Sequence, residues 1–277
     1  MIYRAYHAGP ASALHIPIHG GIGIYNRTVS VVNPATGART IDYGTLGCIV
    51  THKTTNKPYI LSNQHVLYPS GKKYGIGDLI YEQGTDKQAI GRTSQFGHQL
   101  FFAAGEPYID AALAEPLAPV SYEIPGIGYI RGMTEPVTGM KIKLLGARSG
   151  FLTGQITNAN PVVAGKQGLF FHNAPSIGGD SGSAIVSDPD NLMVGLNMQT
   201  SMVGGVPTGI GCRASAIAAK FNIDYTAAIP VTPAPSLIPV TPTPLQPSQL
   251  GTFLSTPQGQ QIGMIVIAGL IVLALVK

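Results

Sequence analysis

The sequence is organised around one stretch, Ser176-Ile177-Gly178-Gly179-Asp180-Ser181-Gly182-Ser183-Ala184-Ile185-Val186. A serine between glycines needs a special turn, in which its own amide and a nearby glycine amide point at one spot while the hydroxyl stays exposed. That geometry suits the nucleophile of an acyl-transfer reaction. Taken alone, however, Gly179 to Gly182 could equally be a tight turn that leads into a strand. The interpretation therefore depends on finding a base and a residue that orients it.

The composition indicates an all-β protein with short strands. The 277 residues include 35 glycines and 22 prolines, only 11% are charged, and Val, Ile, Thr and Tyr recur in runs. The net charge of +4 comes from scattered lysines and arginines, so we expect no nucleic-acid partner. Cys48 and Cys212 lie far apart in the sequence and are interpreted as reduced, buried thiols, unless the fold brings them together to pair.

Breaks in composition divide the chain into segments. Strand-like runs separated by Gly and Pro fill two β-rich halves, and Ala214 to Phe221 has the helix formers and apolar face of a short helix. Beyond it, Ile229-Pro-Val-Thr-Pro repeats as Ile238-Pro-Val-Thr-Pro, which favours a semi-rigid, proline-rich linker. The expected segments are an extended lead-in at 1–40, β-rich halves at 41–119 and 120–226, a linker at 227–261 and an apolar helix at 262–277.

The apolar C-terminal run consists of 15 residues, from Ile262 to Val276, and is followed by Lys277. As a helix it would be about 22 Å long, shorter than a hydrocarbon core of ~30 Å. Because it lies beyond the linker, we expect residues 262–276 to form a short membrane helix, with a helix buried in an assembly as the alternative. The N-terminus carries no apolar segment, which predicts no cleavable signal peptide and a membrane-tethered globular part on the cytoplasmic side.

Two other polar residues stand in apolar surroundings. His65 follows the strand-like run 57–62 and precedes Val66 and Leu67, and alone it could be an ordinary core histidine. Asp110 interrupts an apolar run, and a buried carboxylate is costly unless it is paired or hydrogen-bonded. It could cap a helix or pair with His65. One shared site with Ser181 explains all three residues together.

The motifs around these residues resemble those of trypsin-like serine peptidases. The matching stretches are Leu61-Ser-Asn-Gln-His65-Val-Leu, Ile109-Asp110-Ala-Ala-Leu and Gly179-Asp-Ser181-Gly-Ser. Two further stretches, Gly44-Thr-Leu-Gly and Gly146-Ala-Arg-Ser-Gly-Phe-Leu-Thr-Gly, are similar to those of bacterial trypsin-like proteins of poorly defined substrate. The resemblance covers about residues 40 to 222 and implies two six-stranded antiparallel β-barrels with the site in the cleft between them.

The resemblance also implies a mechanism. Ser181 would attack a peptide carbonyl while His65 takes its proton, and Asp110 would orient and stabilise the imidazole. The amides of Gly179 and Ser181 would bind the oxyanion. The implied substrate is a polypeptide, and the implied chemistry requires neither a metal nor an organic cofactor.

Three departures from the family pattern affect what the resemblance implies. In digestive relatives the residue matching Asp180 pairs with a new N-terminus, but no activation sequence precedes Gly44, so the partner of Asp180 is left open. Pro175 replaces the residue that sets the pocket charge in trypsin, so we expect a small or apolar P1 side chain rather than Arg or Lys. Val66 replaces the cysteine beside the catalytic histidine, which supports free thiols. The predicted pocket residues are Pro175, Ser176, Gln199, Thr200 and Gly204.

Three functions are compatible with this sequence. The first is a membrane-tethered serine endopeptidase. The second is a catalytically silent binding module on the same fold, which the unexplained Asp180 would allow. The third is a structural or assembly protein whose apolar tail packs against partners. The triad and Gly179 favour the peptidase, because a silent copy has no physical need to keep three costly polar groups together.

Overall fold

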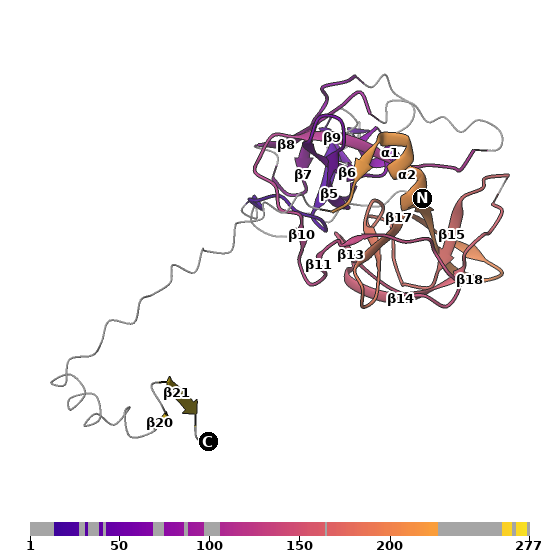
Figure 1. The fold of residues 1–277 in the computed structure, drawn as a ribbon. Helices are drawn as coiled ribbons and strands as arrows, with labels where there is room; N and C mark the ends of the chain where they lie inside the picture. The colour runs from indigo at the N-terminus through magenta and orange to yellow at the C-terminus, as the bar shows by residue number, and fades with distance from the viewer. Residues whose placement is uncertain are drawn as a thin grey trace. The chain divides into compact units, whose positions relative to one another are not determined.

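A computed structural model describes residues 14–27, 43–68, 75–85, 88–96, 106–163 and 165–226, and the backbone of strands at 31–32, 39–40, 262–267 and 270–275. The chain divides into two units, Met1–Ile229 and Pro230–Lys277. The first unit is mostly β with few helices (Figure 1), so the all-β prediction is confirmed. The predicted linker at 227–261 lies outside the described residues.

The first sheet is a curled sheet of eight strands in the order β19-β5-β6-β9-β8-β7-β1-β4. Its aliphatic core includes Ile24, Ile49, Ile60 and Ile80, all at most 1% exposed. We expected a closed six-stranded barrel here, whereas the described strands form an open, curled sheet. The strands are β1 (Gly23–Asn26), β4 (Gly44–Thr45), β5 (Cys48–His52), β6 (Lys57–Ser62), β7 (Leu79–Glu82), β8 (Ala89–Thr93), β9 (Ala112–Pro116) and β19 (Ile223–Asp224).

The first sheet also begins earlier in the sequence than predicted. Strand β1 lies within the expected lead-in and pairs antiparallel with both β4 and β7. Ile18, Ile22 and Ile24 are buried against the same core. Ile22 and Ile24 face it together because alternate residues of an extended segment point to the same side, whereas Ile18 lies before the turn at Gly20 and Gly21. The Gly and Pro breakers in this region therefore end short strands without separating them from the sheet.

The second sheet closes into a six-stranded antiparallel barrel, because β17 pairs with both β16 and β18. Ile142, Leu144, Phe170, Ile185 and Val194 fill its interior, each at most 1% exposed. These strands lie within the second β-rich half that the sequence predicts at 120–226. They are β13 (Lys141–Gly146), β14 (Gly150–Asn158), β15 (Leu169–His172), β16 (Ala184–Ser187), β17 (Leu192–Val203) and β18 (Val206–Arg213), with β12 (Gly132–Met133) parallel to β17.

The helices and remaining strands of the first unit are short. The predicted helix is confirmed as α2 (Ala214–Phe221), which buries Ile217 and Phe221 and ends at Asn222 in the left-handed region (φ 52°). A single helical turn, α1 (Gln64–Leu67), follows β6 directly and carries His65. The remaining strands are β2 (Val31–Val32), β3 (Arg39–Thr40), β10 (Glu123–Ile124) and β11 (Gly128–Tyr129).

The two sheets approach each other closely beside Ser181. A Cβ added to Gly47, which lies between β4 and β5 of the first sheet, would be 2.4 Å from the carbonyl oxygen of Gly182, so only glycine fits there. Cys48 and Cys212 belong to one apolar cluster shared by the two sheets, and both are free and buried, as predicted. Burial raises the pKa of each thiol to about 12, so both stay protonated and inert at neutral pH.

The apolar C-terminal run forms strands instead of the predicted helix. β20 (Ile262–Ile267) and β21 (Leu270–Leu275) pair antiparallel, with Ile267 opposite Leu270. The β-branched isoleucines and valines of this run favour strands, and only Ala268 and Gly269 separate the two strands in the sequence. Among the described residues, no helix is both long and apolar enough to cross a membrane. Membrane association of residues 262–276 and a cytoplasmic location stay predictions.

Candidate active site

The structure brings His65 and Asp110 together. Nδ1 of His65 lies 2.6 Å from Oδ2 of Asp110, and the backbone amide of His65 donates to Oδ1 of the same carboxylate at 3.1 Å. The Asp110 side chain is 6% exposed and that of His65 is 43% exposed. A carboxylate that accepts from Nδ1 favours the tautomer with its proton on Nδ1, which leaves Nε2 as the basic nitrogen.

Asp110 is held in place by the backbone around it. The residues after it form β9 in the first sheet, so the explanation of Asp110 as a helix cap is wrong. Nδ2 of Asn63 donates to its carbonyl oxygen at 2.7 Å, and the thiol of Cys212 lies 3.7 Å from the same oxygen. The second contact comes from β18 of the second sheet, so residues of both sheet regions hold the backbone of Asp110.

The turn at residues 178–182, which carries Ser181 and is called the serine turn below, lies against the segment that carries His65. A Cβ added to Gly44 would lie 2.3 Å from Cγ2 of Val66 and 2.7 Å from the carbonyl oxygen of Ser181, which places both atoms beside Gly44. On the next residue, a Cβ added to Gly182 would lie 2.3 Å from Oγ of Ser62. The neighbours of Ser181 therefore contact the neighbours of His65. The Ser181 hydroxyl donates to the carbonyl of Met198 at 3.0 Å.

The partners of Asp180, which the sequence left open, are the loop between β13 and β14 of the second barrel and the Ile177 amide of its own turn. The carboxylate is fully buried and accepts four hydrogen bonds, from the amides of Arg148, Ser149 and Ile177 and from the Ser149 hydroxyl, at 2.6 to 3.0 Å. Hydrogen bonds of this kind offset the desolvation of a buried carboxylate. Asp180 is thus stabilised by donors within the intact chain and requires no new N-terminus.

Thr45 of β4 fixes the turn from the side of the first sheet. Its amide donates to the carbonyl of Ser181 at 2.7 Å, and its hydroxyl donates to the carbonyl of Gly179 at 2.9 Å. The same hydroxyl accepts from the amide of Ala147, at 2.9 Å. One residue thereby joins the first sheet, the serine turn and the loop that holds Asp180.

The two amides predicted to bind an oxyanion are available for it. Gly179 has φ +105°, a conformation that glycine adopts readily and other residues rarely do. Among the hydrogen bonds of the described residues, the amides of Gly179 and Ser181 donate to no protein acceptor. Two such donors in one turn can stabilise a negative oxygen.

The predicted pocket residues do not all come together. Ser176 is buried, and its hydroxyl lies 3.0 Å from that of Thr200, which also donates to the Ser176 carbonyl at 2.7 Å. Gln199 and Pro175 are exposed. Gly204 forms the tip of the β17–β18 hairpin with Gly205, both at positive φ, and has nothing near its Cβ position. A glycine at this position suits the two-residue hairpin turn, and the structure shows no contact between Gly204 and Ser176.

Behind Ser176 lies a buried histidine that sequence reasoning did not single out. His172 is fully buried, and its Nε2 lies 3.1 Å from Oδ1 of Asn197, which also faces the Ser176 hydroxyl at 3.4 Å. Burial lowers the pKa of His172 to about 4, despite the opposing effect of the Asn197 hydrogen bond. The ring is therefore neutral at pH 7.

Acid is expected to destabilise the protein through His172. Below a pKa of about 6.5 the unfolded chain binds a proton that the folded chain binds only near pH 4. The free energy of unfolding should therefore fall by about 3 kcal/mol as the pH drops through this window. Urea unfolding of the wild type and His172→Gln at about pH 7.5 and 4.5 measures this, and the variant should lose less. Equal losses would contradict it.

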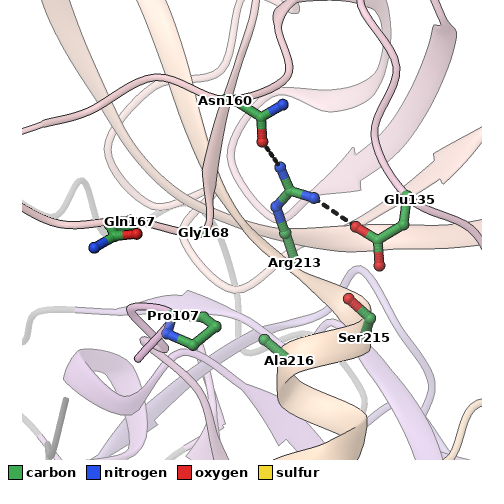
Figure 2. A pocket seen from close by; sticks show the side chains of 8 residues that line it. All are labelled: Pro107, Glu135, Asn160, Gln167, Gly168, Arg213, Ser215 and Ala216. Carbon is green, nitrogen blue, oxygen red and sulfur yellow. Dashed lines mark hydrogen bonds and ion pairs between the residues drawn. The ribbon is translucent and has the colours of Figure 1, made fainter. Parts of the chain in front are cut away.

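A separate pocket of about 440 Å³ lies at the start of α2. Figure 2 shows Arg213 there between Glu135 and Asn160, and it donates to Oε2 of Glu135 at 2.5 Å. The lining residues are Pro107, Glu135, Asn160, Gln167, Gly168, Arg213, Ser215 and Ala216, which include none of the predicted site residues. Nor do the described residues contain a group of three His, Cys, Asp or Glu side chains that could hold a metal ion.

Several solved structures of similar fold are named as proteases. A Nocardiopsis protease is 16% identical, with a TM-score of 0.53 over 76% of this chain and 98% of that one. Protease A of Thermobifida fusca is 15% identical, with a TM-score of 0.50 over 76% and 98%. An alpha-lytic protease homologue, N4, is 19% identical, with a TM-score of 0.51 over 75% and 98%. The first unit of this chain has the chymotrypsin fold.

The trypsin-like fold that the three motifs implied is thereby confirmed. At these identities the similarity concerns the chymotrypsin fold alone. No protein-family model matches the sequence, and a comparison with curated proteins finds no match.

Sequence reasoning gave no role to four residues that now contact the site, namely Thr45, Asn63, Arg148 and Ser149. All four lie in the stretches that carry the family resemblance, which was the only signal for them. Their contacts join residues that are up to 134 positions apart. No local pattern encodes such contacts, so the sequence could mark these stretches without assigning their roles.

Proposed function

We propose that this chain is a serine endopeptidase that hydrolyses peptide bonds through an acyl-enzyme. The observation that carries the proposal is the double contact of the Asp110 carboxylate with His65, at its amide and at Nδ1. This arrangement sets the tautomer and the orientation of the imidazole, which is the function of the aspartate in a Ser-His-Asp triad. The serine turn beside His65 supplies the nucleophile.

The proposed reaction begins with attack of Ser181 Oγ on the carbonyl carbon of the scissile peptide. His65 Nε2 accepts the hydroxyl proton, and Asp110 stabilises the imidazolium that forms. For this step the hydroxyl must rotate away from the Met198 carbonyl that it now contacts. The amides of Gly179 and Ser181 bind the oxyanion, and each such donor contributes about 10²- to 10³-fold in rate.

Collapse of the tetrahedral intermediate breaks the C–N bond, and His65 passes its proton to the leaving amine. An acyl ester on Ser181 remains. Water then attacks this ester while His65 accepts a proton from the water. His65 passes that proton to Ser181 Oγ, which releases the acid product and restores the Ser181 hydroxyl.

The proposed substrate is a polypeptide with a small or apolar P1 side chain. Pro175 carries no charge at the position that would select Arg or Lys, and the hydroxyls of Ser176 and Thr200 bond to each other. Those hydroxyls therefore need no polar group from a substrate. The solved structures of similar fold are named as proteases, which supports a polypeptide substrate for this chain.

Labelling of the full chain with a fluorophosphonate probe near pH 7.5 tests the proposal. We expect the wild type to be labelled and Ser181→Ala not to be labelled, because the probe reacts with an activated serine hydroxyl. Ser215→Ala, at the pocket beside α2, is the matched control and should be labelled like the wild type. A folded wild type that does not react would contradict the peptidase and favour a silent binding module.

A further inference from the structure

The peptide unit between Gly178 and Gly179 decides whether the oxyanion site exists. Its N–H is one of the two proposed oxyanion donors, and its carbonyl belongs to Gly178. In a planar trans peptide the C=O and N–H point in opposite directions, so the direction of one fixes the other. Both flanking residues are glycines, which have no Cβ to restrict their backbone angles. This unit can therefore rotate at low cost unless something holds it.

A side chain does hold it. Nη1 of Arg148 donates to the carbonyl oxygen of Gly178 at 3.1 Å. The Gly179 N–H therefore points away from Arg148, and among the described residues it donates to no protein acceptor. The direction of the amide thus depends on a contact made by Arg148.

The Cβ end of the Arg148 side chain also packs against the turn at Gly179. A Cβ added to Gly179 would lie 3.2 Å from Cβ of Arg148 and 3.0 Å from the ring of Tyr43. The following peptide unit is held separately, because the Thr45 hydroxyl donates to the Gly179 carbonyl. Each of the two peptide units that meet at Gly179 thus accepts a hydrogen bond from one side chain, and the second unit also donates from the Asp180 amide to the Ile177 carbonyl at 3.0 Å.

We propose that Arg148 is a positioning residue, which holds the Gly179 amide in the orientation that binds an oxyanion. The inference rests on the proposed peptidase function and adds a residue to its machinery. The backbone amides of Arg148 and Ser149 support Asp180, the neighbour of Gly179, at 3.0 Å. The loop thus stabilises the turn through its backbone and orients the Gly178–Gly179 peptide through its guanidinium.

The test compares fluorophosphonate inactivation rates of full-length variants. Arg148→Met keeps the length of the side chain but removes the hydrogen-bond donor. We expect the second-order rate constant to fall about 10- to 10²-fold, where the larger value corresponds to complete loss of one oxyanion donor. Arg148→Lys retains a donor and should recover part of the rate. Arg92→Met, which removes a distant arginine paired with Glu115, should react like the wild type.

Two further measurements distinguish a positioning role of Arg148 from a general loss of structure. The midpoint of the pH–rate profile should stay unchanged in Arg148→Met, because the contact of His65 with Asp110 is intact, and only the plateau should fall. Thermal unfolding of the variant should match that of Arg92→Met, because the hydrogen bond from Arg148 to the Gly178 carbonyl is exposed. A wild-type rate in Arg148→Met, with labelling that still requires Ser181, would overturn the role of Arg148 and leave the peptidase standing.

Crystal structures of the wild type and Arg148→Met test the inference independently of activity. We expect the Gly178–Gly179 peptide to rotate, or to adopt two orientations, once the Arg148 donor is gone. If the wild type does not react at Ser181, the peptidase proposal fails, but this comparison still decides the positioning role. An unchanged peptide orientation in Arg148→Met would overturn it.

Discussion

Asp110→Asn is expected to lower the rate of hydrolysis about 10⁴-fold while the protein stays folded. The asparagine Oδ1 can still accept from the amide of His65, as Asp110 Oδ1 does at 3.1 Å. Its NH₂ group, however, would face Nδ1 as a donor. The imidazole would then carry its proton on Nε2, where it could not accept the proton of Ser181. The rate with an activated ester or a selected peptide measures the effect.

The control for this prediction is Asp188→Asn. This change also replaces a carboxylate by an amide, but it does so in the ion pair with Lys143, where Asp188 is 40% exposed. We expect its rate to be close to that of the wild type, since such pairs contribute little. A loss of less than tenfold in Asp110→Asn, with an unchanged fold by circular dichroism, would contradict a triad role for Asp110.

The features that could be predicted from the sequence are those that short stretches encode. The run 57–62 is a strand because β-branched and apolar residues fit a half-buried sheet, and α2 follows from its alanines and apolar face. His65 and Asp110 could be paired in advance because a buried carboxylate needs a partner. Both arguments use the chemistry of a side chain or the period of a pattern.

The features that escaped prediction depend on backbone groups brought together by the fold. Asp180 is satisfied mainly by main-chain amides, and every residue except proline has such an amide, so no residue type identifies those donors in advance. Gly204 was predicted to line the pocket with Gln199 and Thr200, whereas it forms the hairpin turn between β17 and β18 at positive φ. In the run 262–275, length and hydropathy suggested a helix, whereas β-branching favoured the strands that the structure shows.

Gly146→Ala is expected to destabilise the protein and to abolish most of its reactivity. The added Cβ would lie 2.3 Å from Oδ1 and 2.5 Å from Cγ of the buried Asp180 carboxylate, so the carboxylate must move. Moving it weakens four hydrogen bonds to a charged, buried group, which costs about 2 to 4 kcal/mol. Because Asp180 lies between Gly179 and Ser181, the displacement also disturbs both oxyanion amides. Labelling should slow by at least about 10²-fold.

The expected loss of stability in Gly146→Ala is opposite in sign to the usual effect of replacing glycine by alanine. Gly146 has no positive φ, and at such positions glycine to alanine ordinarily stabilises a protein by about 0.4 to 1 kcal/mol through the unfolded state. Gly75→Ala is the matched control, since its new Cβ would meet only Oδ1 of Asp78 at 3.6 Å. Urea unfolding and the labelling rate of both variants measure the effect. A Gly146→Ala protein as stable and as reactive as Gly75→Ala would show that the serine turn does not depend on where the Asp180 carboxylate sits.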